Sequence, residues 1–154
     1  RCAVDCEACA WDATAGWVGP GVAGVVGVTP AWRAGRGSGY DLSVGAESAW
    51  LAERAALPHV VVGAWPAAHV ANWRLLVRAR ALDGVRWTVG AGRTGTAGGE
   101  RRADEATYAG NSLVVRPDGR VAAELGRDPA TLSATLDRDT LAAQRELVGA
   151  VDGV

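Results

Sequence analysis

Three cysteines, the most reactive side chains of the sequence, lie together at its start. Cys2, Cys6 and Cys9 have the spacing with which three thiolates can hold a [4Fe–4S] cluster and leave one iron open. Such a cluster belongs to a long barrel-forming chain with a strand before the motif, and neither is evident here. We favour the interpretation that the three cysteines occur by chance in a truncated or frame-shifted N-terminus. We therefore predict no cofactor. An odd number of cysteines at one end is also no disulfide framework.

Two further patterns could bind a ligand. Residues 90–95 read G-x-G-x-x-G after a predicted strand, which is half of a dinucleotide fingerprint. The other half is missing, because residues 96–107 are polar and interrupted by glycine where a helix should receive the pyrophosphate. His59 and His69 flank a predicted strand, but no further ligands converge on them. We therefore expect an ordinary loop, solvated or capping histidines, and no metal site.

Composition narrows the class of protein. The 154 residues are 49% hydrophobic and 21% charged, which is typical of one globular domain or part of one. The net charge of −1 gives no reason to expect a nucleic-acid partner. No apolar run is long enough for a membrane span and no signal peptide is evident, so we expect a cytoplasmic protein without a membrane partner.

Two residue types are absent. All 16 basic residues are Arg, because the sequence has no Lys, and it also has no Met and opens at Arg1. We therefore expect a fragment, or a reading frame that was cut or shifted near its start.

The elements that would position a site become regular after residue 39. Residues 1–38 show neither a helical stripe nor alternation, although the apolar run 22–28 could form a buried strand. Asp139 predicts the cap of the last helix, and Gly84 fits the end of the middle one. The patterns predict helices at 47–57, 70–82 and 140–148, and strands at 60–64, 87–91, 112–115, 121–125 and 131–136, with a hairpin turn at 116–119.

A collinear series of motifs extends from residue 39 to residue 148. The motifs read Gly39-Tyr40-Asp41-Leu42, Ala64-Trp65-Pro66, Asn72-Trp73 followed by Arg78-Ala79-Arg80-Ala81-Leu82, Gly92-Arg93-Thr94-Gly95, Tyr108-Ala109-Gly110-Asn111-Ser112, Pro117-Asp118-Gly119 and Leu136-Asp137. In this order and spacing they resemble the motifs of the carbon–nitrogen hydrolase (nitrilase) family, and two of them, Trp65-Pro66 and Arg78-Ala79-Arg80-Ala81-Leu82, are similar to those of ω-amidase-like members.

The resemblance implies both a fold and a chemistry. The fold is α/β: residues 39–150 supply the C-terminal half of a four-layer αββα sandwich, and residues 1–38 are a poorly patterned segment before it. Intact relatives hydrolyse non-peptide carbon–nitrogen bonds of small amides or nitriles through a Cys thioester, with a Glu and a Lys, and often form homo-oligomers. Carried onto this sequence, Tyr40, Trp65 and Arg93 take the positions of an oxyanion donor and of the substrate pocket.

The departures from the family pattern concern the chemistry itself. Gly39 stands at the nucleophile position, where it offers no thiolate, and no Lys can hold the oxyanion. Gly92 replaces the Asn of the Asn-Arg loop, and no upstream Glu is recognisable. We predict that this chain alone is inactive. Three hypotheses stay open: a hydrolase fragment, a non-catalytic pseudoenzyme that binds or assembles, and a gene-model artefact of an intact enzyme.

Overall fold

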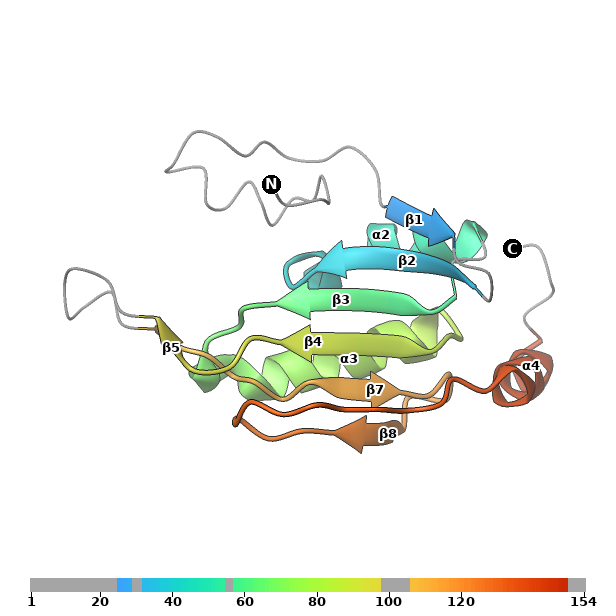
Figure 1. Ribbon diagram of the computed structural model, residues 1–154. Coiled ribbons are helices and arrows are strands. Elements are labelled where there is room, and N and C mark those ends of the chain that lie inside the picture. The colour runs from blue at the N-terminus through green and yellow to red at the C-terminus, as the bar shows by residue number, and fades with distance from the viewer. Residues whose placement is uncertain (1–24, 29–31, 55–56, 98–105, 150–154) are drawn as a thin grey trace.

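A six-stranded mixed sheet forms the centre of the computed structural model, which describes residues 25–28, 32–54, 57–97 and 106–149 (Figure 1). Its strand order is β1-β2-β3-β4-β7-β8; β2, β3 and β4 run parallel, whereas β1, β7 and β8 are antiparallel to their neighbours. A separate two-stranded ribbon joins β5 to β6. The strands are β1 (Val25–Val28), β2 (Arg33–Ser38), β3 (His59–Gly63), β4 (Thr88–Gly92), β5 (Thr96–Ala97), β6 (Ala106–Thr107), β7 (Leu113–Val115) and β8 (Val121–Glu124).

Helices cover one face of this sheet (Figure 1). Helix α3 buries Trp73, Val77 and Ala81 completely, at a spacing of four residues that puts them on one stripe. None of the described helices has the length and hydrophobicity that a bilayer crossing needs. The helices are η2 (Asp41–Ser43), α2 (Gly45–Glu53), η3 (Ala67–His69), α3 (Val70–Asp83) and α4 (Arg138–Leu147).

Two strand glycines let α3 lie close to the sheet. A Cβ at Gly63 would lie 2.8 Å from Trp73 Cζ3, and a Cβ at Gly90 would lie 2.9 Å from Trp73 Cζ2. The Trp73 ring therefore rests directly on the backbone of β3 and β4. The core around it consists of Leu42, Val61, Trp73, Val77, Ala81, Leu113 and Val115.

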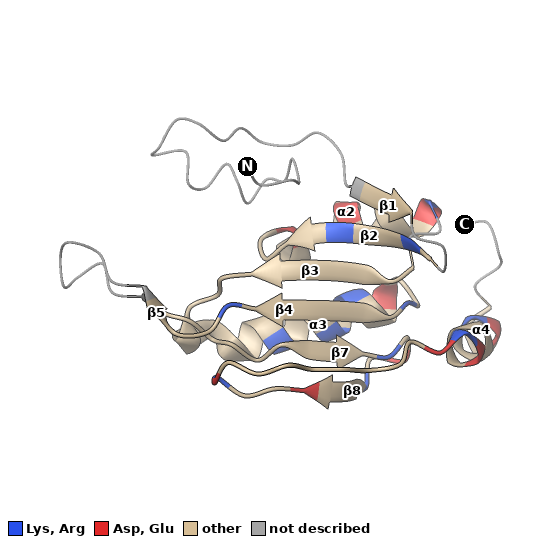
Figure 2. Cartoon of the chain, in the orientation of Figure 1, with Lys and Arg blue, Asp and Glu red and all other residues tan. Residues whose placement is uncertain are grey.

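The opposite face of the sheet is only partly covered. Near the start of β4, Trp87, Val114 and Leu141 form a second buried cluster, and α4 contacts the sheet through its Leu141. Toward the other end, Val62 is 56% exposed and Ala91 is exposed as well. Figure 2 shows no charged residue within β3, β4 and β7. The part of this face that these strands form is therefore uncharged and only half covered, whereas β2 adds the exposed Arg36 beside Val60.

Most of the predicted elements are confirmed within two to four residues, and three strands were missed. Two of them are the two-residue strands β5 and β6, and the third is β2, which pairs with β3 in parallel from Gly35↔His59 to Ser38↔Val62. Two of the three buried positions of β2, Gly35 and Gly37, carry no side chain, so the sequence shows no apolar alternation there. The sheet consequently takes strands from both sides of the predicted division at residue 39.

Two other predictions about the C-terminal region are wrong. Residues 131–136 form no strand; Leu132 and Leu136 give the segment its apolar pattern because they pack on the second cluster. The cap of α4 is Asp137 rather than Asp139, since the Asp137 carboxylate accepts hydrogen bonds from the backbone N–H groups of Asp139 and Thr140. The predicted helix 47–57 begins earlier, at Gly45, and ends at Glu53.

The end of α3 has an unusual cap. The Arg86 N–H donates to Ala81 O (3.0 Å) and the Val85 N–H to Leu82 O (3.3 Å), which is the Schellman pattern. Gly84 is the C-cap, as predicted, but the left-handed residue is Val85, with φ 42°. Glycine is needed one position earlier, because the Arg86 guanidinium lies against the Gly84 Cα where a Cβ would stand. A β-branched residue therefore carries the strain that glycine normally avoids.

This cap makes a prediction about stability. Val85→Gly should raise the free energy of unfolding by about 1 kcal/mol, because it relieves a left-handed β-branched residue. Gly84→Ala, one position away, should lower it by about 1–3 kcal/mol through overpacking against Arg86. Urea denaturation of both variants measures the two effects, and a stabilising Gly84→Ala would contradict this account.

Candidate functional site

The predicted site residues gather at the carboxyl ends of the three parallel strands. Gly39 follows β2, Trp65 follows β3 by two residues, and Arg93 follows β4 directly. Because parallel strands end at the same edge of a sheet, residues distant in sequence become neighbours there, as in the ligand crevices of open α/β sheets. The Arg93 N–H donates to Gly63 O (2.8 Å), which joins the ends of β4 and β3.

Gly39 and Trp65 are in direct contact. The Trp65 indole Nε1 donates to the carbonyl oxygen of Gly39 at 3.2 Å. A Cβ built on Gly39 would lie 2.5 Å from that Nε1 and 2.9 Å from Trp65 Cδ1. The indole therefore occupies the space into which any side chain at position 39 would extend.

Arg93 and Tyr108 form the second part of the site. The Arg93 guanidinium carbon lies 4.3 Å from the centroid of the Tyr108 ring, a cation–π contact. The segment after Tyr108 is tied to both strand ends, because Ala109 N–H donates to Trp65 O (2.8 Å) and Gly110 N–H donates to Arg93 O (2.9 Å). Tyr108 is not among the predicted site residues, and its place in a matched motif was the signal that could have identified it.

Two consecutive residues with left-handed backbone conformation shape the segment that follows Tyr108. Gly110 has φ 61° and Asn111 has φ 49°, a conformation that Gly and Asn tolerate better than other residues. Asn111 is fixed by four contacts: its O accepts from Trp73 Nε1 (2.8 Å), its N–H donates to Gly126 O (2.9 Å), and its Nδ2 donates to Glu124 Oε1 (3.2 Å) and Leu125 O (3.3 Å). The loop is thus held in one conformation from α3 and from β8.

Gly92 packs directly against this segment. A Cβ at this position would collide with the carbonyl oxygen of Gly110. The Gly92 N–H donates to Ser112 Oγ at 3.0 Å, so the two segments are locked together. The close approach of two backbones explains why this chain has glycine at position 92.

Tyr40 shares the turn with Gly39 but stands apart from the other site residues. Its side chain is 47% exposed, and within the described residues it makes no hydrogen bond or ring contact. Its carbonyl accepts from the Ser43 N–H (2.8 Å) as η2 begins. The structure therefore joins Gly39 with Trp65 and Arg93 with Tyr108, and leaves the Tyr40 ring free at the rim.

The turn rests on buried polar residues. The Ser38 N–H donates to Asp41 Oδ2 at 2.5 Å, and this hydrogen bond links the two ends of the turn. A Cβ at Gly37 would lie 3.2 Å from His59 Nε2 and 3.5 Å from Asp41 Oδ2, so His59 reaches under the same turn. Burial, with the nearby charges of Arg86 and Arg80, lowers the pKa of His59 to about 3. The imidazole is therefore neutral at neutral pH.

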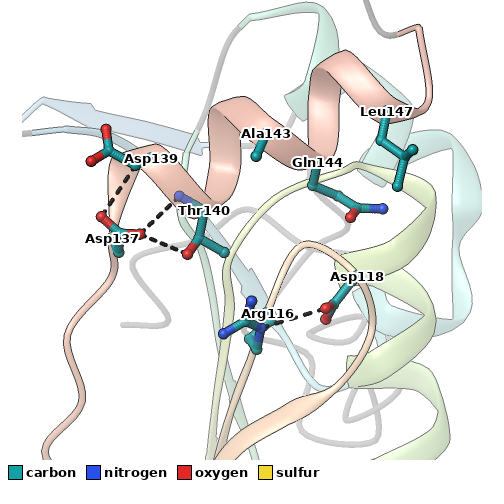
Figure 3. A pocket seen from close by; sticks show the side chains of 8 residues that line it. All are labelled: Arg116, Asp118, Asp137, Asp139, Thr140, Ala143, Gln144 and Leu147. Atoms are coloured by element: carbon teal, nitrogen blue, oxygen red, sulfur yellow. Dashed lines mark hydrogen bonds and ion pairs between the residues drawn. The ribbon is translucent and has the colours of Figure 1, made fainter.

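A separate hollow of about 500 Å³ lies between the β7–β8 turn and α4 (Figure 3). Among its lining residues, Arg116 pairs with Asp118 (3.5 Å) and Asp137 caps α4. In the part of the chain that is described, no three His, Cys, Asp or Glu side chains gather as metal ligands would. Cys2, Cys6 and Cys9 lie outside the described residues.

A family model described as carbon-nitrogen hydrolase matches residues 25–146, which include every site residue above. The chain belongs to the carbon–nitrogen hydrolase family. A hydrolase of Mycobacterium tuberculosis is 36% identical over 140 residues, covering 85% of this chain and 49% of the relative. A 2-oxoglutaramate amidase of Bacillus subtilis is 30% identical over 90 residues, covering 58% of this chain and 32% of the relative.

A solved structure shows the fold of the carbon–nitrogen hydrolases. A Saccharomyces cerevisiae member of branch 10 of the nitrilase superfamily superposes with a TM-score of 0.77 at 23% identity, over 88% of this chain and 48% of that one. The predicted α/β fold, half of a four-layer αββα sandwich, is confirmed. The chain spans about half the length of these curated relatives.

The Gly39–Trp65 contact predicts an energetic coupling between the two positions. Gly39→Ala should lower the free energy of unfolding by about 1–3 kcal/mol, because its Cβ overlaps the indole. In a Trp65→Leu background the same change should cost clearly less, since neighbouring residues couple. Gly126→Ala is the matched control, as a Cβ there meets nothing within 4 Å. Equal costs in both backgrounds, measured by urea denaturation, would disprove the coupling.

The neutral, buried His59 predicts acid sensitivity. The unfolded chain binds a proton near pH 6.5 and the folded chain only near pH 3, so stability falls as the pH drops between these values, by roughly 1.4 kcal/mol per pH unit. His59→Gln should remove this part of the slope, whereas His69→Gln, at an exposed position, should keep it. Urea denaturation at pH 7, 6, 5 and 4 measures the slopes; identical slopes for His59→Gln and the unmodified chain would refute the assignment.

Proposed function

We propose that this carbon–nitrogen hydrolase chain forms one wall of a small-amide or nitrile site and has no hydrolytic activity of its own. The family resemblance implies a Cys nucleophile, a general-base Glu and an oxyanion-holding Lys. Gly39 stands at the nucleophile position and the sequence has no Lys. The observation that carries the proposal is the Trp65 indole, which fills the space of a side chain at position 39.

The position of Arg93 favours a substrate that bears a carboxylate. Arg93 is exposed, follows a central strand at the site edge, and is oriented by the Tyr108 ring. A guanidinium binds a carboxylate through two parallel hydrogen bonds, which makes it suited to orienting such a substrate. The Bacillus subtilis relative is named for 2-oxoglutaramate, which carries an amide and a carboxylate. On this proposal, Trp65 and Tyr40 line the same side of the substrate.

A non-catalytic role in binding or assembly is the alternative. It is supported by the uncharged part of the sheet face formed by β3 and β4, where Val62 and Ala91 are exposed beyond the cluster that α4 covers. Such a face is apolar enough to pack against another surface. A homo-oligomer and a cytoplasmic location remain predictions.

Hydrolysis is tested directly. The purified chain should release no ammonia from 2-oxoglutaramate or propionitrile above a heat-denatured sample, because no nucleophile stands at position 39. Gly39→Cys alone should also be inactive, since the indole occupies the thiol position and no Lys is present. The Bacillus subtilis amidase serves as the active control for 2-oxoglutaramate. Ammonia released by the unmodified chain at a rate proportional to its concentration would overturn the proposal.

Binding separates the pocket-wall proposal from the assembly alternative. Titration calorimetry with 2-oxoglutaramate should show binding that Arg93→Gln weakens at least about tenfold, because a charge-assisted pair is lost. Arg120→Gln is the matched control, since Arg120 is 83% exposed on the hairpin turn. If the unmodified chain binds no 2-oxoglutaramate, or if both variants weaken binding equally, the pocket-wall proposal fails and the assembly alternative stands.

A further inference from the structure

The segment that holds Tyr108 beside Arg93 lies between the residues after β3 and the residues after β4. On one side, Pro66 and Tyr108 form an isolated antiparallel bridge. On the other side, the Gly110 N–H donates to Arg93 O (2.9 Å). The path by which this segment continues into β7 is decided one residue later, at Asn111, where φ is 49°.

The Asn111 side chain connects this turn to β8. A left-handed conformation at a residue other than glycine persists only where the surrounding structure enforces it. Asn111 Nδ2 donates to Glu124 Oε1 (3.2 Å), at the end of β8, and to Leu125 O (3.3 Å), directly after it. Glycine would accept the same φ but would make neither hydrogen bond. The side chain at position 111 therefore has a task beyond permitting the turn.

Glu124 is held in turn by helix α3. Arg74 Nε donates to Glu124 Oε1 at 2.5 Å and Arg74 Nη2 donates to Oε2 at 2.8 Å, which is a bidentate pair. The hydrogen bonds from Arg74 lower the pKa of Glu124 against the effect of burial, and the Asn111 hydrogen bond lowers it further, so the carboxylate is charged at neutral pH. An ion pair at the surface adds little to stability by itself. This one also fixes the acceptor that Asn111 uses.

We propose that Asn111 and Glu124 are positioning residues for the Arg93–Tyr108 pair. They hold the Tyr108 ring where it orients the Arg93 guanidinium toward a carboxylate, so the inference rests on the proposed function of Arg93. They act through the backbone, because Asn111 directly follows Gly110, whose N–H is bonded to Arg93 O. A merely stabilising ion pair would change the free energy of unfolding and leave the Arg93 side chain where it is.

NMR of the full chain tests the proposal, because the Tyr108 ring current shifts the signals of the Arg93 side chain. Asn111→Asp keeps the size of the side chain and the tolerance of positive φ, but it places a carboxylate oxygen beside Glu124. The Arg93 signals should move toward those of an exposed arginine. The Gly110 N–H should exchange about tenfold faster, and the Kd for 2-oxoglutaramate should rise about tenfold.

A compensating variant separates positioning from general destabilisation. In the Asn111→Asp background, Glu124→Gln supplies an N–H donor opposite the new carboxylate and keeps an oxygen for Arg74, so the Arg93 signals and the Kd should return toward those of the unmodified chain. Glu124→Gln alone should weaken binding. Asp118→Asn is the matched control, because Asp118 is an ion-paired carboxylate of the same hairpin, and it should change neither quantity.

Unchanged Arg93 signals in folded Asn111→Asp, or no recovery when Glu124→Gln is added, would overturn the proposal. If Asn111→Asp does not fold, Glu124→Ala takes its place, since it removes the acceptor shared by Arg74 and Asn111, and the same shift of the Arg93 signals is required. If the unmodified chain binds no 2-oxoglutaramate, the proposed function alone fails, because the Arg93 signals and the Gly110 exchange rate still decide the positioning.

Discussion

The packing of Trp73 on two glycines of the sheet is the contact on which the rest of the structure depends. Its ring touches the backbone of β3 at Gly63 and of β4 at Gly90, so no other residue type fits at these positions without displacing α3. The same indole donates to Asn111 O (2.8 Å), and its centroid lies 6.2 Å from that of Trp65. One side chain therefore sets the distance of the helix layer from the sheet, the left-handed loop before β7, and one side of the site.

The position of Trp73 also explains why the Trp65 ring lies beside Gly39. Trp65 lies between Trp73 and Gly39, and its Nε1 is held by the Gly39 carbonyl, so the indole has a partner on each side. Gly39 has no side chain, and the neighbouring Trp65 ring occupies the space into which a Cβ would extend. A side chain at this position would need both a changed residue and a displaced ring. The other part of the site, with Arg93 over Tyr108, presents an exposed guanidinium of the kind that the proposal assigns to a carboxylate-bearing substrate.

The sheet has two different faces, and they suggest different roles. The helix-covered face contains both the apolar core around Trp73 and the buried polar residues His59, Arg86 and Thr88. The part of the other face formed by β3, β4 and β7 is uncharged and only half covered, by α4 and the cluster around Trp87. The chain spans about half the length of these curated relatives. On the two proposals, a partner would pack on the half-covered face of the sheet, and a small molecule would bind at the carboxyl ends of its parallel strands.

The sequence by itself determined the family, the α/β class and most of the elements, because periodic apolar residues and turn motifs are local signals. It also determined that position 39 has no nucleophile and that no Lys is present. Only the tertiary structure decided what fills that position, since the Trp65 indole comes from the segment after β3, distant in the sequence. Contacts of the same kind decided the strain at Val85, beside which Arg86 folds back onto Gly84, and the role of Asn111, whose four partners are distant in the sequence. Strand β2 was missed because two of its three buried residues are glycines. A local pattern shows which residues are buried, but contacts between segments decide what each one touches.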